Sequence, residues 1–319
     1  MDETSEHIPE PVHPAETGDR KLSFFERHQL HPILFAGVSL IVIFVFYQVI
    51  GGIVTFFILG SSSIGRENVW TIRWLTLLGQ LFLILLPTLL FAKLFSVKLR
   101  SVFPFRIPGI RESTLALIAL FSLQRLFEAY MFFQDRIPLP QLLREFIDPI
   151  KKMMEELIKI LLHVESPVEL LAVIFIIAVV PSIVEELLFR GLIQKVFERL
   201  MSPLVAAILS GTIFGLFHVN PLELVPLIGL GVFFGILRFR SQSLWLPISA
   251  HFFNNLLAVL AVYYGLAQEN SLESLQSDVD VQMMVFQFAA FAALFFISFV
   301  AYLRLTHNIS KNTYWKEFH

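Results

Sequence analysis

The residues of this chain that could do chemistry begin in one stretch, "VVPSIVEELLFRG", residues 179–191. Glu185, Glu186 and Arg190 stand there at the end of a long apolar run, where an ionised group is costly unless it is paired or kept near water. Glu186 and Arg190 are four residues apart and share a helical face, so we expect them to form an ion pair. Glu185 is rotated by about 100° from Glu186 on a helix. It therefore needs another role.

Two histidines and two asparagines follow on later apolar segments. His218 lies in "IFGLFHVN", and His251, Asn254 and Asn255 lie in "WLPISAHFFNNLLAV". His251 and Asn255 are four residues apart and share a face, with Asn254 close to it. Taken singly, His218 suits the membrane surface, and the others suit hydrogen bonds between helices.

Together, Glu185, His218, His251 and Asn255 provide what hydrolysis by water requires. One group takes a proton from water, a second orients that water, and further groups donate hydrogen bonds to an oxyanion. The same set predicts equally a zinc site, with Glu185, His218 and His251 as ligands and water as the fourth, although no H-E-x-x-H motif is present. A proton relay in a carrier would use the same residue types. These three alternatives remain open on the residues alone.

The elements that must position these residues are membrane helices. Of 319 residues, 56% are hydrophobic and 16% are charged, against roughly 25% charged in soluble domains, and the mean hydropathy is +0.71. The chain has no cysteine, which excludes disulfides and thiolate metal sites. A net charge of -2 without a basic cluster excludes a nucleic-acid partner.

We therefore predict an all-α, polytopic membrane protein with about eight transmembrane helices. Residues 1–28 are predicted to be a disordered cytosolic tail, and residues 29–319 a helical transmembrane domain whose motif-bearing core is about 170–265. The expected spans are 33–59, 72–95, 113–133, 167–190, 203–219, 221–238, 243–265 and 281–303.

Two polar features lie outside that core. In the segment 134–166, residues 150–162 are apolar at helical spacing and predict an amphipathic helix at the membrane interface, a soluble partner-binding helix being the alternative. In the third span, Arg125 and Glu128 are three residues apart and predict a structural ion pair, with contact to substrate at a cavity wall as the alternative.

Basic residues predict the orientation of the chain. Every second connection is basic, including the 96–112 loop, whereas the 266–280 loop has four acidic residues and no Lys or Arg. We therefore expect an integral protein of the plasma (inner) membrane with both termini in the cytosol.

Three short motifs resemble those of a known family. "EELLFR" fits E-E-x-x-x-R, "FGLFH" fits F-x-x-x-H and "HFFNN" fits H-x-x-x-N, in this order on successive apolar segments. This pattern is similar to that of the CPBP family, the type II CAAX prenyl endopeptidases and the bacteriocin-processing and immunity proteins. The resemblance covers about residues 170–265.

The resemblance implies an intramembrane endopeptidase that cleaves a peptide or a lipid-modified protein near the cytosolic leaflet, with membrane lipids as its other partners. Glu185 would activate water with the help of His218, while His251 and Asn255 would hold the oxyanion. The implied bracing groups are Glu186 and Arg190. We expect no cofactor, with zinc held by Glu185, His218 and His251 as the alternative. A non-catalytic immunity or peptide-binding protein is the other alternative, and the sequence predicts no oligomeric state.

Overall fold

The computed structural model describes residues 21–60, 66–138, 140–265 and 281–309. The first 20 residues of the tail predicted over 1–28 thus lie outside the described residues. The part that is described forms a helical turn, α1 (Phe24–Arg27). Ser23 and Glu26 begin this turn with a reciprocal capping box, in which each side chain accepts a hydrogen bond from the other's backbone N–H.

The fold is all-α, as predicted. In the described residues the one extended pairing is an isolated bridge between Phe105 and Ser243. The helices are α2 (Pro32–Phe44), α3 (Gly51–Leu59), α4 (Val69–Gly79), α5 (Leu86–Phe95), α6 (Leu99–Val102), α7 (Ile110–Gln134), α8 (Gln141–Leu162), α9 (Pro167–Val173), α10 (Val180–Glu186), α11 (Gln194–Phe197), α12 (Pro203–Phe217), α13 (Leu224–Ser241), α14 (Trp245–Tyr263) and α15 (Val281–Leu305). A short 3₁₀ turn, η2 (Arg66–Asn68), precedes α4.

Four π-helical segments join some of these helices into longer ones. They are η1 (Val45–Ile50), η3 (Gln80–Leu85), η4 (Ile174–Val179) and η5 (Leu187–Ile193). Each adds a residue to the local turn, which shifts the side chains that follow and leaves backbone carbonyls for other donors.

Seven of the described helices are long and apolar enough to cross a membrane. They are Pro32–Leu59, Val69–Phe95, Ile110–Gln134, Pro167–Phe197, Leu224–Ser241, Trp245–Tyr263 and Val281–Ile309. The remaining expected span, 203–219, corresponds to α12, whose 15 residues make a helix about 22 Å long, shorter than the roughly 30 Å hydrocarbon core. The prediction of a polytopic helical membrane protein is confirmed.

Two boundaries differ most from the predicted ones. The fourth span was expected to end at residue 190, but the helix continues to Phe197 because Gln194 is fully buried and donates to the Gly235 carbonyl at 3.2 Å. The amphipathic helix expected over 150–162 begins earlier, so that α8 covers Gln141–Leu162.

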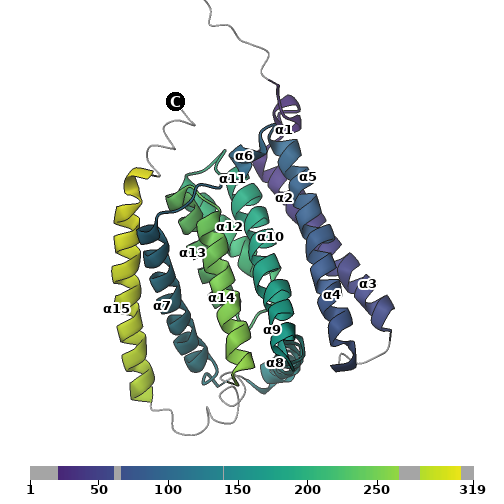
Figure 1. The fold of residues 1–319 in the computed structure, drawn as a ribbon, viewed down its shortest axis with the longest axis vertical. Coiled ribbons are helices and arrows are strands. Elements are labelled where there is room, and N and C mark those ends of the chain that lie inside the picture. Colours follow the sequence, from purple (N-terminus) through teal and green to yellow (C-terminus); the bar gives the residue numbers. More distant parts are fainter. Residues whose placement is uncertain (1–20, 61–65, 139, 266–280, 310–319) are drawn as a thin grey trace, which may run out of the picture.

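The spanning helices form a layered bundle (Figure 1). The α9–α11 helix, α12, α13 and α14 lie in the middle, with α7 and then α15 along one edge and the α2–α3 and α4–α5 helices along the other. The N-terminal α1 and the end of α15 lie at the same end of the bundle. At the opposite end, α8 is seen nearly end-on and thus lies across the bundle.

Small residues bring α12 and α13 unusually close together. A Cβ atom added to Gly211 would lie 2.3 Å from the backbone nitrogen of Val232, and one added to Gly231 would lie 2.4 Å from the carbonyl oxygen of Gly211. Such backbone approach is typical of membrane helix pairs with small residues four apart. It also turns backbone carbonyls of α13 toward the polar residues of the α10–α11 segment.

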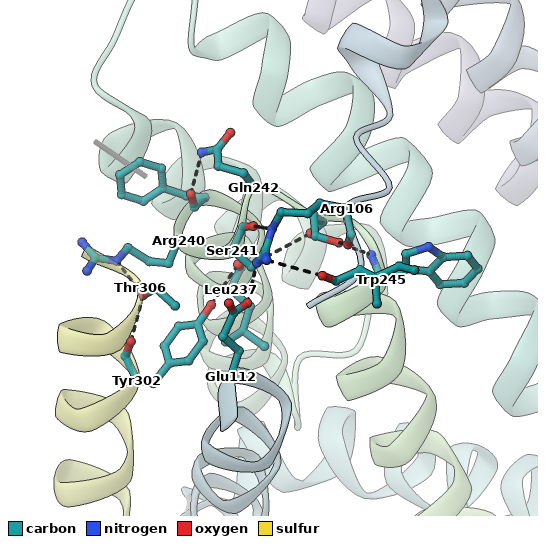
Figure 2. Close-up of polar contacts among 12 residues, drawn as sticks. Arg106, Glu112, Leu237, Arg240, Ser241, Gln242, Trp245, Tyr302 and Thr306 are labelled. Atoms are coloured by element: carbon teal, nitrogen blue, oxygen red, sulfur yellow. Dashed lines mark hydrogen bonds and ion pairs between the residues drawn. The ribbon is translucent and has the colours of Figure 1, made fainter. Parts of the chain in front are cut away.

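A polar cluster ties the helices together at the end of the bundle where α15 ends (Figure 2). Arg106 donates to the Ser241 carbonyl at 2.7 Å and forms an ion pair with Glu112 at the start of α7. From α15, the Tyr302 hydroxyl donates to the Leu237 carbonyl at 3.1 Å. These contacts fix α7, α13 and α15 around the turn from which α14 begins.

Candidate active site

Glu186 and Arg190 form a completely buried ion pair, as their spacing predicts. The Arg190 Nη1 donates to Glu186 Oε1 at 2.8 Å, and neither side chain is exposed. Arg190 Nη2 donates to the Gly231 carbonyl at 2.8 Å, which is within reach because α13 packs so closely on α12. Glu186 Oε1 also contacts Nδ1 of His251 at 3.0 Å. This pair therefore links α10, η5, α13 and α14.

Aromatic rings enclose the pair and the two imidazoles. The Arg190 guanidinium carbon lies 4.4 Å from the centroid of the Phe214 ring, within cation–π range. Phe214 contacts the His218 ring edge-on at 4.6 Å, and Phe234 stacks on the His251 ring at 5.1 Å. These apolar walls limit the rotation of both imidazoles.

Glu185 faces the two histidines. Its Oε2 lies 3.9 Å from Nε2 of His218 and 3.9 Å from Nε2 of His251. The Glu185 side chain is 18% exposed, whereas Oε2 itself is buried and makes no hydrogen bond within the described part of the chain. Three polar atoms from α10, the end of α12 and α14 thus converge. The sequence predicted these residue types as a set but gave no distances between them.

The other nitrogen of each imidazole defines the tautomer. Nδ1 of His218 lies 2.8 Å from the Phe214 carbonyl oxygen, and Nδ1 of His251 lies 3.0 Å from the Glu186 carboxylate. Both partners accept hydrogen bonds only, so each Nδ1 carries the hydrogen. In the neutral rings, the lone pair on Nε2 is then directed toward the region of Glu185.

Glu185 and His218 lie at similar depth in the bundle. At 1.5 Å per residue, Glu185 is about 18 Å from the Phe197 end of its helix, and His218 is about 22 Å from the Pro203 end of α12. These two ends are neighbours in the chain, joined by residues 198–202. The convergence of the two side chains follows from that common level.

Asn255 lies one helical turn from His251 and bonds elsewhere. Its Nδ2 donates to the Ile177 carbonyl at 3.3 Å, and its Oδ1 accepts from Asn254 at 3.1 Å. Pro181 has no N–H, so the Ile177 carbonyl cannot receive the bond that an α-helix would give it from four residues later. Asn255 supplies that donor from α14. The structure thus joins Glu185, His218, His251, Glu186 and Arg190 directly, whereas Asn255 lies one helical turn from His251 and contacts Asn254 and Ile177.

Several polar residues near the site were not predicted as part of it. Tyr47 in η1 hydrogen-bonds with Gln80 in η3 and lies close enough to Glu185 for their charges to interact. Gln124 in α7 donates to Asn254 at 3.0 Å. The sequence signal that could have identified them is that each is a polar residue within an otherwise apolar span.

Two further predictions concern charges and metals. Arg125 and Glu128 form the ion pair predicted for the third span. Within the described residues, no group of three or more His, Asp or Glu side chains has an arrangement suited to a metal ion.

Comparisons with known proteins agree with the motifs. Residues 167–257 match the family model "Type II CAAX prenyl endopeptidase Rce1-like". The chain is 30% identical over 87 residues to the "Putative membrane peptidase YdiL" of Bacillus subtilis (strain 168). That alignment covers 27% of this chain and 36% of the relative, so it spans little more than a third of the relative's length. No solved structure gives a significant match.

The matched segment contains every residue that converges at the site, from Glu185 to His251, together with Asn255. Residues 167–257 are thus similar to the Rce1-like type II CAAX prenyl endopeptidases, in agreement with the three motifs.

Proposed function

We propose that this chain is an intramembrane endopeptidase that hydrolyses a peptide bond with water activated by Glu185. The observation that carries the proposal is the approach of Glu185 Oε2 to both imidazole Nε2 atoms, at 3.9 Å each. A water molecule between these atoms is within reach of all three, because hydrogen bonds of about 2.8 Å span such separations. The Rce1-like match over residues 167–257 supports peptide-bond chemistry.

In the first step, Glu185 accepts a proton from that water, and the oxygen attacks the carbonyl carbon of the scissile peptide. The second hydrogen stays on the attacking oxygen and donates a hydrogen bond to Nε2 of His218, which directs the oxygen lone pair toward the substrate. The carbonyl π electrons move to oxygen, which gives a tetrahedral oxyanion. When the carbonyl re-forms, the C–N bond breaks and the proton held by Glu185 passes to the leaving nitrogen, so the products are a carboxyl group and an amine.

His251 and Asn255 are proposed to stabilise the oxyanion. Asn255 has two hydrogens on Nδ2 and donates one to Ile177, which leaves the other for substrate. Nδ1–H of His251 is directed at Glu186, so Nε2 donates only when the ring carries both protons. The Glu186 carboxylate lies where it stabilises that positive charge, and Arg190 holds the carboxylate in position.

Zinc is the alternative to directly activated water. A tetrahedral zinc ion with bonds of about 2.1 Å holds its ligand atoms about 3.4 Å apart. Glu185 Oε2 is 3.9 Å from each Nε2, so the cluster does not fit zinc at these separations. The proposed reaction therefore needs only the side chains and water, and a chelation experiment tests the zinc alternative.

The substrate is proposed to be a peptide or the lipid-modified C-terminus of a protein, reached laterally from the bilayer or from the cytosol. Glu185 is partly exposed while its bracing pair is fully buried. Glu185 is thus accessible to substrate, while the buried Glu186–Arg190 pair next to it holds the helix in place. This arrangement suits a general base better than a purely structural role.

Purified protein in lipid nanodiscs, assayed with a panel of quenched peptides with and without a prenyl group, tests the proposal. We expect Glu185→Gln and His218→Ala to lower cleavage at least about 10²-fold while the thermal unfolding midpoint stays close to that of the parent. Glu145→Gln is the matched control, because Glu145 is an exposed carboxylate on α8 at the far end of the bundle.

Each rival gives a different result in the same assay. Cleavage by both Glu185→Gln and His218→Ala at the parental rate would refute the mechanism. Loss of cleavage on dialysis against a strong chelator, restored by zinc, would support the zinc site. Peptide binding without product would indicate a non-catalytic binding protein, and solute flux driven by a proton gradient would indicate a carrier.

A further inference from the structure

Three carboxamide side chains form a hydrogen-bonded row that runs from α7 through α14 to η4. Gln124 Nε2 donates to Asn254 Oδ1 at 3.0 Å, Asn254 Nδ2 donates to Asn255 Oδ1 at 3.1 Å, and Asn255 Nδ2 donates to the Ile177 carbonyl at 3.3 Å. Gln124 lies outside the three motifs, and Asn254 stands at an unspecified position of the third. The row ends on the residue to which the proposed mechanism gives an oxyanion contact.

The direction of the hydrogen bonds in this row defines the orientation of the Asn255 amide, that is, where its NH₂ group and its oxygen lie. A carboxamide has an oxygen that accepts and a nitrogen that donates, and the two ends are close in size. Asn254 donates to the oxygen of Asn255. The Ile177 carbonyl, which Pro181 cannot serve because proline has no N–H, receives from the Asn255 nitrogen. Both contacts favour the same orientation of the Asn255 amide.

The orientation matters because an oxyanion requires a donor. If the Asn255 amide rotated by half a turn, its oxygen would replace the NH₂ group and repel the developing negative charge. Water screens such a repulsion weakly inside a membrane protein, because the local dielectric is low. A chain of hydrogen bonds also polarises each member, which strengthens the last donor.

We propose that Gln124 and Asn254 are positioning residues that hold the Asn255 carboxamide with its NH₂ group ready for the oxyanion. This inference rests on the proposed function. Neither residue touches substrate, and both act through Asn255. The competing explanation is that the row only joins α7 to α14, as polar side chains often do between membrane helices.

Asn254→Asp is the most specific probe of the row. An aspartate still accepts from Gln124, but when ionised it has no N–H for Asn255 and instead attracts its NH₂ group. We expect kcat to fall about 10- to 100-fold with KM within two-fold, because one oxyanion donor contributes about 10²–10³ to kcat. Gln124→Met, which removes the first donor at similar length, is expected to lower kcat about five-fold by loosening the row.

A double-mutant cycle separates positioning from packing. In the Asn255→Ala background, Asn254→Asp and Gln124→Met are expected to change kcat less than two-fold, because the group through which they act is absent. Gln134→Met is the matched control. Gln134 is also on α7 and donates to the Leu222 carbonyl at 3.0 Å, so its loss removes a contact of similar kind outside the row and is expected to leave kcat unchanged.

The outcomes are distinguishable. If Gln124→Met and Asn254→Asp lower kcat as much without the Asn255 amide as with it, or lower only the unfolding midpoint, the inference is overturned. If Asn255→Ala cleaves normally while Glu185→Gln does not, the inference fails and the proposed peptidase stands. If Glu185→Gln cleaves normally, or the parent cleaves no peptide, the proposed function fails and the inference with it.

Discussion

At the scale of single residues, the site depends on one buried carboxylate with two partners. Glu186 receives Arg190 from its own helix and His251 from α14. The first contact was predictable, because residues four apart on a helix meet. The second was not, because the distance between Glu186 and His251 depends on how α10 packs on α14. The convergence of Glu185 on both imidazoles is likewise a result of tertiary packing.

Removing Arg190 is expected to destabilise the protein strongly. Arg190→Met leaves the fully buried Glu186 carboxylate without its cation, and such a loss costs about 3–5 kcal/mol of unfolding free energy. The double variant Glu186→Gln/Arg190→Met leaves no uncompensated charge and should recover most of that loss. Unfolding followed by tryptophan fluorescence in mixed micelles measures both.

Arg100→Met provides the control for that measurement. Arg100 is exposed on α6, and a surface substitution changes stability by about 0.5 kcal/mol or less. A double variant as unstable as Arg190→Met alone would contradict the explanation, since the harm would then come from lost packing of the Arg190 side chain rather than from an unpaired charge.

At the scale of helices, hydropathy predicts where the spans lie but not how closely they pack. The predicted end of the fourth span, residue 190, was wrong, because the helix continues for seven more residues to Phe197. Gln194 is a polar residue, yet it is buried against α13. The close pair α12–α13 was not predicted either. Its signal was present in the spacing of Gly211 and Gly215 and of Gly231 and Gly235.

The α12–α13 contact is expected to tolerate no methyl group. In Gly211→Ala the new Cβ would lie 2.3 Å from the Val232 nitrogen, so the two helices must separate, at a cost of about 1–3 kcal/mol. Separation also moves the Gly231 carbonyl from Arg190, so cleavage should fall with stability. Thermal unfolding and peptide cleavage of the same preparation measure the two effects.

Gly37→Ala is the matched control for this substitution. Gly37 is inside α2 and a Cβ there meets no atom within 4 Å. Alanine at such a helical position is expected to be neutral or stabilising by up to about 1 kcal/mol. If Gly211→Ala were as stable and active as Gly37→Ala, close backbone packing would not be what holds Gly231 against Arg190.

At the scale of the whole molecule, the bundle has two distinct ends. The end with α1, α6 and the last turn of α15 carries the Arg106–Glu112 cluster, and the other end carries α8 (Figure 1). Alternation of basic connections predicted that both termini lie on one side, and α1 and the end of α15 do lie together. Which membrane face that end meets remains a prediction, because basic residues indicate the cytosolic face through the insertion process rather than through the fold.

The chain has no cysteine, so single cysteines labelled with a membrane-impermeant maleimide can test this orientation. Arg100→Cys on α6 should react in inside-out vesicles and Glu145→Cys on α8 in right-side-out vesicles, since both positions are exposed at opposite ends of the bundle. Ala36→Cys, at a fully buried position in α2, should react in neither. Reaction of Arg100→Cys and Glu145→Cys from the same side would contradict the arrangement of α8 across the far end. The inverse pattern would leave the fold intact but turn the α6 end outward, and a lipid-modified C-terminus made in the cytosol would then have to reach Glu185 from the α8 end.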